Sequence, residues 1–278
     1  MEKILLAQDA QCLSRSAIDF ACYLAKLTHS RLTGVFLEDV LSRDQPEAKA
    51  VYESAHQDGV ATIAERTQEA RTLTEENIRL FREACVCRGV TSRIHRDRGV
   101  PAAEIIDESR FADLIIVDAD TSFSRNNEPL PGRFVKDVLL EAECPIILSP
   151  YSLESIEEIF FAYNSTPSSV FAIKAFSYLF PELSTKKITL LNVRNDGVQA
   201  IEEAHNMKEW LSDHYSDVEI VVLKGDPADE LFAWLLEKKN GMLVMGAYGR
   251  GMLSRFFKPS HARLIVKSVN LPIFIAHH

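Results

Sequence analysis

The sequence has few cysteines, few glycines and prolines, and no long apolar run. Its five cysteines are an odd number within the first 144 of the 278 residues, which is a poor framework for disulfides and favours a reducing compartment. The 11 glycines and 11 prolines exclude collagen-like and low-complexity chains. No apolar run approaches the roughly 20 residues of a membrane helix, and the first residues enter a strand pattern instead of a signal peptide. We therefore expect a cytoplasmic protein with no membrane partner, in which Cys85 and Cys87 are ordinary thiols.

Basic residues are also in deficit. The chain has 31 Lys and Arg against 40 Asp and Glu, a net charge of −9. No overall positive field can attract a nucleic acid, so any anion site has to be local. The content of hydrophobic residues, 46%, is enough for well-packed cores, and the length predicts two domains at about 100 to 200 residues each.

One segment of the first half returns in the second half. Arg98-Gly-Val-Pro-Ala-Ala-Glu, followed by the apolar run 112–117, recurs as Lys224-Gly-Asp-Pro-Ala-Asp-Glu, followed by 241–245. Both copies predict a loop, a helix with proline in its first turn, and a buried strand. The runs Cys144-Pro-Ile-Ile-Leu and Leu271-Pro-Ile-Phe-Ile then end the two halves alike, which indicates an internal repeat.

The apolar strands of this repeat are continuous, which is typical of parallel strands buried on both faces. We predict an α/β protein with two tandem, doubly wound, five-stranded parallel-sheet domains of Rossmann-like type, at residues 1–150 and 151–278. The first domain is longer by about 30 residues, which we assign to a helical insertion at about 39–87, with its helical pattern over 61–87. We interpret it as a solvated insertion, and a lid or partner-docking arm is the alternative.

A glycine loop in the second half is the candidate anion site. Gly246 and Gly249 follow the buried strand 242–245, and Ser260 and His261 open the last helix. Glycines let backbone amides approach a phosphate, and a helix start adds unpaired N–H groups. The loop also collects basic residues, namely Arg250, Arg255, Lys258 and Arg263. The alternative is a glycine-shaped turn with a solvated basic face. No Gly-Lys-Ser or Gly-Lys-Thr occurs, which excludes a Walker loop.

With these residues the chain resembles the universal stress protein family, in the form that carries two such domains. Members that bind ATP have Gly-x2-Gly-x9-Gly followed by Ser or Thr after the fourth strand. Gly246, Gly249 and Ser260 fit this pattern, whereas Pro259 stands in place of the third glycine. The resemblance implies an adenine nucleotide, ATP or AMP with magnesium, as the ligand of the second domain. The family pattern places Asn164, Val193, Gly246, Gly249 and Ser260 at the nucleotide, and the basic loop and the helix start add Arg250 and His261 as candidate nucleotide-binding residues.

The first half departs further from this pattern. It retains Asp9 at the end of the first strand, but Asp118 and Asp120 lie where the glycines would be, and Gly132-Arg133 replaces Gly-Ser. Carboxylates in this place repel a polyphosphate unless a metal ion lies between them. We therefore expect this half not to bind ATP and to have a structural or protein-binding role.

No catalytic pattern accompanies the loop. The sequence has no nucleophile elbow and no zinc spacing, and Asp9 alone does not make a phosphorylation receiver. We expect a non-catalytic regulator of the stress response. The alternative is a nucleotide-independent module for an unknown protein partner. The last strands of the two halves are expected to pair as an internal pseudo-dimer, and a homodimer of the whole chain stays open.

Overall fold

The computed structural model describes residues 1–39, 63–124, 128–194, 199–247 and 269–277. The strands and helices of the first half are β1 (Lys3–Asp9), α1 (Arg15–Leu27), β2 (Arg31–Asp39), α4 (Ile63–Arg88), β3 (Ser92–Gly99), α5 (Pro101–Ser109), β4 (Leu114–Asp118), α6 (Arg133–Glu141) and β5 (Ile146–Ser149). Those of the second half are β6 (Glu158–Tyr163), α7 (Pro167–Leu179), a 3-10 turn (Pro181–Leu183), β7 (Lys187–Arg194), α8 (Gln199–Ser212), β8 (Val218–Lys224), α9 (Pro227–Leu235), β9 (Gly241–Gly246) and β10 (Ile273–Ala276).

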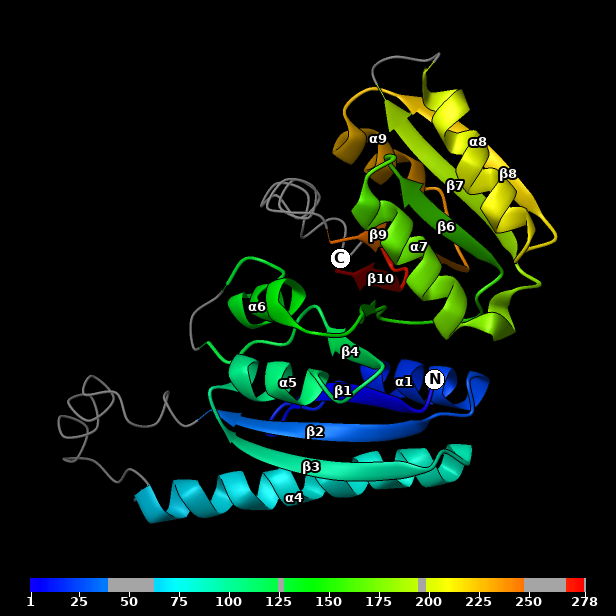
Figure 1. Ribbon diagram of the computed structural model, residues 1–278. Coiled ribbons are helices and arrows are strands. Elements are labelled where there is room, and N and C mark those ends of the chain that lie inside the picture. The colour runs from blue at the N-terminus through cyan, green and yellow to red at the C-terminus, as the bar shows by residue number, and fades with distance from the viewer. Residues whose placement is uncertain (40–62, 125–127, 195–198, 248–268, 278) are drawn as a thin grey trace.

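The strands form one ten-stranded sheet in the order β3-β2-β1-β4-β5-β10-β9-β6-β7-β8. Each half has the same strand order, and all pairs within a half are parallel (Figure 1). The halves join through β5 and β10, which run antiparallel, with Ile147 opposite Phe274. The predictions of two tandem, doubly wound sheets and of an internal pairing through the last strands are confirmed.

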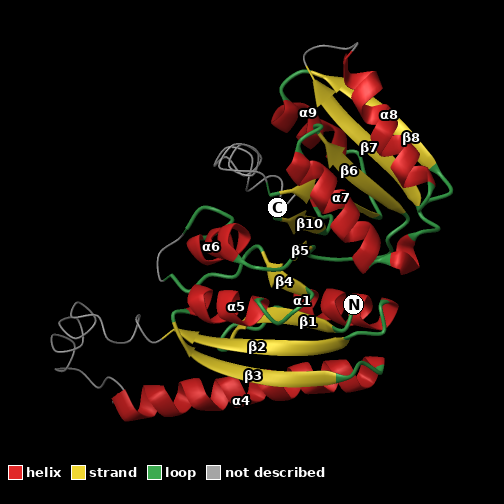
Figure 2. Cartoon of the chain, viewed as in Figure 1, coloured by secondary structure: helices red, strands yellow, loops and turns green. Residues whose placement is uncertain are grey.

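Helices cover both faces of the sheet (Figure 2). Neighbouring residues of each strand point to opposite sides, so each strand contributes apolar side chains to both faces. Ile4 and Leu6 of β1 belong to one core, which is covered by α1, α4, α7 and α8. Leu5 and Ala7 belong to the other core, which is covered by α5, α6 and α9. Each core contains residues of both halves, so the strand junction is buried on both faces. Among the described residues, no helix is long and apolar enough to cross a membrane.

The repeated glycine segments have the same local structure in both halves. A Cβ atom on Gly99 would lie 1.9 Å from Oε1 of Glu104, and one on Gly225 would lie 2.5 Å from Oε1 of Glu230. In each half, therefore, a glutamate in the first turns of the next helix folds back over the glycine. Gly225 also has a φ of +146°, which L side chains rarely adopt. The segment that repeats in the sequence therefore also repeats the same glycine–glutamate contact in the structure.

The helical part of the predicted insertion is α4. It has 26 residues, whereas its counterpart α8 has 14. Asp39 ends β2, and residues 40–62 of the insertion lie outside the described residues. Helix α4 docks on α1, β2 and β3 through a narrow buried stripe that consists of Thr74, Asn77, Phe81 and Cys85. A ring edge of Phe81 fits over Gly34 of β2, where a Cβ atom would lie 2.9 Å away.

Candidate functional site

Three of the predicted nucleotide-binding residues lie at one edge of the second half. Asn164 follows β6, Val193 is near the end of β7, and Gly246 ends β9. Since β6 pairs with both β7 and β9 in parallel, these three strand ends are neighbours. Gly249, Arg250, Ser260 and His261 lie outside the described residues, so their assignment stays a prediction.

Asn164 sets the turn that leads into α7. Its Oδ1 atom accepts hydrogen bonds from the backbone N–H of Thr166 at 3.3 Å and from the Thr166 hydroxyl at 2.6 Å. Thr166 in turn caps α7, because its Oγ1 accepts from the backbone N–H of Ser169 at 3.3 Å. The first turn of a 13-residue helix therefore lies at this edge, and its dipole favours negative charge there.

Gly246 has a packing role of its own. A Cβ atom at this position would lie 2.6 Å from backbone atoms of Ser168, so only glycine lets β9 approach the first turn of α7 this closely. The Ser168 hydroxyl is buried and has no hydrogen-bond partner within the described part of the chain. This glycine is therefore explained by packing, without any ligand.

His277 reaches the same edge from β10, where the N–H of Ala247 donates to the carbonyl of Ala276 at 2.8 Å. Burial lowers the pKa of His277, and a hydrogen bond with the backbone of Leu139 on α6 opposes this shift. The ring is therefore mostly neutral at pH 7 and adds little positive charge for a phosphate. This contact could not be predicted from a local sequence pattern, because Leu139 is 138 positions away from His277.

The matching edge of the first half carries carboxylates. Asp9, at the end of β1, accepts from the backbone N–H of Gln11 at 2.8 Å, as Asn164 does from Thr166. Burial raises the pKa of Asp9, and the nearby charge of Asp39 adds to the rise. A second anion at this edge meets an unfavourable field.

Asp118 and Asp120 are held by donors of the chain itself. Asp118 accepts from the hydroxyl of Ser14, which caps α1, and from the backbone N–H of Asp120 at 2.9 Å. Asp120 accepts from the Tyr151 hydroxyl at 2.9 Å, and burial together with this carboxylate raises the pKa of Tyr151. The oxygens of both carboxylates thus accept hydrogen bonds from the chain itself, and the absence of ATP binding in this half stays a prediction.

The N-terminus of α6 is likewise filled from within. Oε2 of Glu128 accepts from the backbone N–H of Arg133 at 3.1 Å and from the Ser122 hydroxyl at 3.3 Å. A Cβ atom on Gly132 would lie 2.7 Å from the same oxygen. The predicted Gly132-Arg133 position is therefore a carboxylate site, and sequence reasoning missed Glu128 because its role depends on how the loop folds back.

A linker, residues 150–157 between β5 and β6, connects the halves and is tied to both. Oδ1 of Asn270, just before β10, accepts from the N–H groups of Tyr151 at 2.8 Å and Ser152 at 3.3 Å. Its Nδ2 donates to the carbonyl of Ser152 at 3.3 Å and to the Ser152 hydroxyl at 3.0 Å. Through the bond from Tyr151 to Asp120, the linker also holds the loop after β4.

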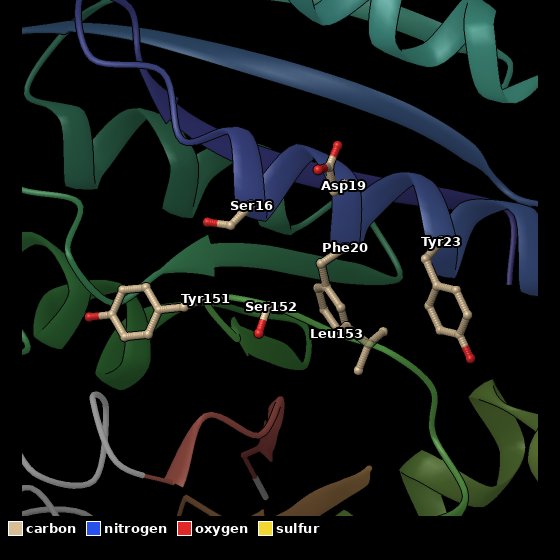
Figure 3. A pocket seen from close by; sticks show the side chains of 7 residues that line it. All are labelled: Ser16, Asp19, Phe20, Tyr23, Tyr151, Ser152 and Leu153. Carbon is tan, nitrogen blue, oxygen red and sulfur yellow. The ribbon is translucent and has the colours of Figure 1, made fainter. Parts of the chain in front are cut away.

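A cavity of about 320 Å³ lies between α1 and this linker (Figure 3). Its apolar part is formed by Phe20 and Leu153, which lie next to each other, whereas Asp19 points the opposite way toward its partner Arg88. The lining residues are Ser16, Asp19, Phe20, Tyr23, Tyr151, Ser152 and Leu153. None of its lining residues is one of the predicted nucleotide-binding residues. Among the described residues, no group of three His, Cys, Asp or Glu side chains can hold a metal ion.

Comparisons with known proteins agree with this architecture. Residues 178–277 match the model of the universal stress protein family. A universal stress protein from Archaeoglobus fulgidus is similar in structure with a TM-score of 0.70 and 12% identity, over 99% of this chain and 98% of that one. A putative universal stress protein from Pseudomonas aeruginosa follows with a TM-score of 0.56 and 15% identity, over 100% and 93% of the chains. No curated protein sequence matches the chain. The resemblance to the family in its tandem form is confirmed, and at these identities the structures show the fold alone.

Proposed function

We propose that the second half binds an adenine nucleotide, ATP or AMP, at the carboxyl ends of β6, β7 and β9, and that the chain acts as a non-catalytic regulator of the stress response. Parallel α/β sheets bind ligands at this edge, where the winding of the sheet reverses. The family match covers residues 178–277, which include the ends of β7 and β9 and the whole glycine loop. The first half then serves as a structural or protein-binding partner in the cytoplasm.

The observation that carries the proposal is the difference between the two edges. In the first half, Asp9 and Asp118 lie at the strand ends, and Glu128 occupies the start of α6. At the ends of β6, β7 and β9, none of the residues that the structure describes is an aspartate or glutamate. The phosphates of a nucleotide therefore meet repulsion in one half and, among the described residues of these strand ends, no carboxylate next to a helix start in the other.

In this proposal, each residue has a separate task. Val193 contacts the adenine ring, and Asn164 hydrogen-bonds the base or the ribose while it still shapes the turn into α7. The backbone of Gly246 and Gly249, with Arg250, Ser260 and His261, receives the phosphates. Magnesium binds to the phosphates of the nucleotide and not to protein carboxylates, because the described residues at these strand ends include no carboxylate. The bound nucleotide then acts as a regulatory ligand and is not hydrolysed.

The test is calorimetry of the full chain with Mg-ATP and with AMP, using two matched variants. Gly249→Asp places a carboxylate in the predicted phosphate loop, and Thr121→Asp places one at the corresponding position of the first half. We expect micromolar binding that Gly249→Asp abolishes and Thr121→Asp leaves unchanged. Equal loss in both variants would refute the placement in the second half. No heat up to millimolar nucleotide, with protein that circular dichroism shows to be folded, would favour the nucleotide-independent protein-interaction module.

A further inference from the structure

Two cysteines from distant parts of the first half are in contact. Cys22 lies in the middle of α1 and Cys85 in the last turn of α4, and their Sγ atoms are 3.8 Å apart. The side chains are 1% and 0% exposed. The two thiols thus share one small buried space, while Cys12 and Cys87 are exposed.

We propose that Cys22 and Cys85 are a modification site at which a hydroperoxide forms a reversible disulfide that fastens α4 to α1. The sulfurs are already in van der Waals contact and have to approach each other to about 2.05 Å to form the bond. Cytosolic disulfides that serve as sensors are transient, which fits a protein whose other thiols are scattered and free.

The surroundings of the pair distinguish the two sulfurs. The hydrogen bond with Cys22 lowers the pKa of Cys85 and burial opposes this shift, whereas a hydrogen bond with Ser92 and the charge of Arg88 lower the pKa further. The same hydrogen bond, together with burial, raises the pKa of Cys22. Cys85, beside Arg88 and Ser92, is therefore the thiol of the pair that loses its proton more readily and attacks, and Cys22 gives up its proton in the second step.

The chemistry balances with a hydroperoxide as the only co-reactant. The Cys85 thiolate attacks the terminal peroxide oxygen, the O–O bond breaks, and an alkoxide or hydroxide leaves and takes up a proton. Cys85 is now a sulfenic acid. The sulfur of Cys22 then attacks the sulfur of Cys85, the S–O bond breaks, and the hydroxyl leaves as water with the proton of Cys22. The two thiols lose two electrons in total and the peroxide gains them. A dithiol reductant reverses the bond by exchange.

Access to the pair depends on α4. Its buried stripe is narrow, and Cys85 is the last buried residue of that stripe before the helix ends at Arg88. The end of a helix held by few contacts opens locally more often than the whole domain unfolds. A peroxide reaches Cys85 in this open state. The disulfide then stops the opening and closes a loop between positions 63 residues apart.

The experiment treats the full chain with hydrogen peroxide, blocks free thiols by alkylation, and maps peptides without reduction. We expect a peptide pair that joins Cys22 to Cys85, loss of two hydrogen atoms from the protein mass, and a melting temperature higher by roughly 5 to 10 °C that a dithiol reverses. Cys22→Ala and Cys85→Ala should abolish the shift, whereas Cys12→Ser and Cys87→Ser should retain it.

Three results would overturn the proposal: both cysteines recovered alkylated, Cys85 found as sulfinic acid with Cys22 free, or a disulfide that involves Cys12 or Cys87 instead. The peptide map of the unmodified sequence decides among them even if the alanine variants fold poorly.

Discussion

Replacing Asn270 tests how the second half holds the linker. Its side chain makes four hydrogen bonds with Tyr151 and Ser152, and its backbone has a φ of +40°, in the left-handed region. Asparagine tolerates that region better than most residues do. Asn270 therefore combines two contributions, side-chain bonds and backbone fit, which different substitutions can separate.

The expected losses in the free energy of unfolding follow from the solvent exposure of the four hydrogen bonds. All four bonds are at the surface, so each contributes near the lower limit of about 0.5 kcal/mol, and Asn270→Gly should destabilise the chain by about 2 kcal/mol. Asn270→Ala loses the same bonds and also places a Cβ atom at positive φ, which adds about 1 kcal/mol. Asn270→Asp keeps both acceptor bonds and loses the two donated bonds, so the expected loss is about 1 kcal/mol.

The assay is urea unfolding followed by two signals. Both tryptophans, Trp210 and Trp234, lie in the second half, so their fluorescence follows that half, whereas circular dichroism follows the whole chain. We expect the order of stability to be wild type, Asp, Gly and Ala. Equal midpoints for Gly and Ala would refute the backbone argument. Midpoints equal to that of the wild type for all three variants would refute the claim that this clamp stabilises the junction.

Two further predictions concern the carboxylates of the first half. Glu128→Gln removes the negative charge at the start of α6 and should cost about 0.5 to 1 kcal/mol in a thermal melt, whereas the matched change Glu141→Gln at the other end of the helix should cost nothing. Asp9→Asn replaces a carboxyl whose pKa is raised mainly by burial. The stability that this carboxyl contributes is therefore present at low pH and is lost as the pH rises through the pKa of the folded state. The variant should therefore melt above the wild type at pH 7, with a difference that disappears toward pH 3. A difference independent of pH would contradict this reasoning.

The sequence was most informative where burial is complete. The strands β4 and β9 have no exposed residue, so they appear as apolar runs, which in β4 end at Asp118. The glycine repeats before α5 and α9 located the two halves around these runs. The edge strand β3, Ser-Arg-Ile-His-Arg-Asp-Arg-Gly, pairs several of its charges with other elements; Arg96 and Arg98, for example, both pair with Glu38 of β2. The residues of such a charged strand do not by themselves predict a strand, because the partners of its side chains lie on other elements and leave no local pattern. It can be predicted only from its place in the internal repeat.

The candidate site was predictable to a smaller extent, for the same reason. The strand-end positions of Asn164, Val193 and Gly246 follow from strand order alone, so sequence reasoning placed them together. The packing of Gly246 against Ser168 and the contact of Cys22 with Cys85 depend on which helix faces lie against each other. Residues 63 positions apart give no periodic signal of such a contact.

The junction of the halves explains why they could diverge. Ile147 and Phe274 hold the same position in the repeat and are also each other's partners across β5 and β10. Ile273 pairs with Leu148 and Ile275 with Ile146, which is the reciprocal pattern of a two-fold interface. In a dimer of identical chains, every substitution appears at both edges at once. In a fused chain, each edge changes alone, so Asp9 and Glu128 can close one edge while Asn164 keeps the same turn without a charge at the other.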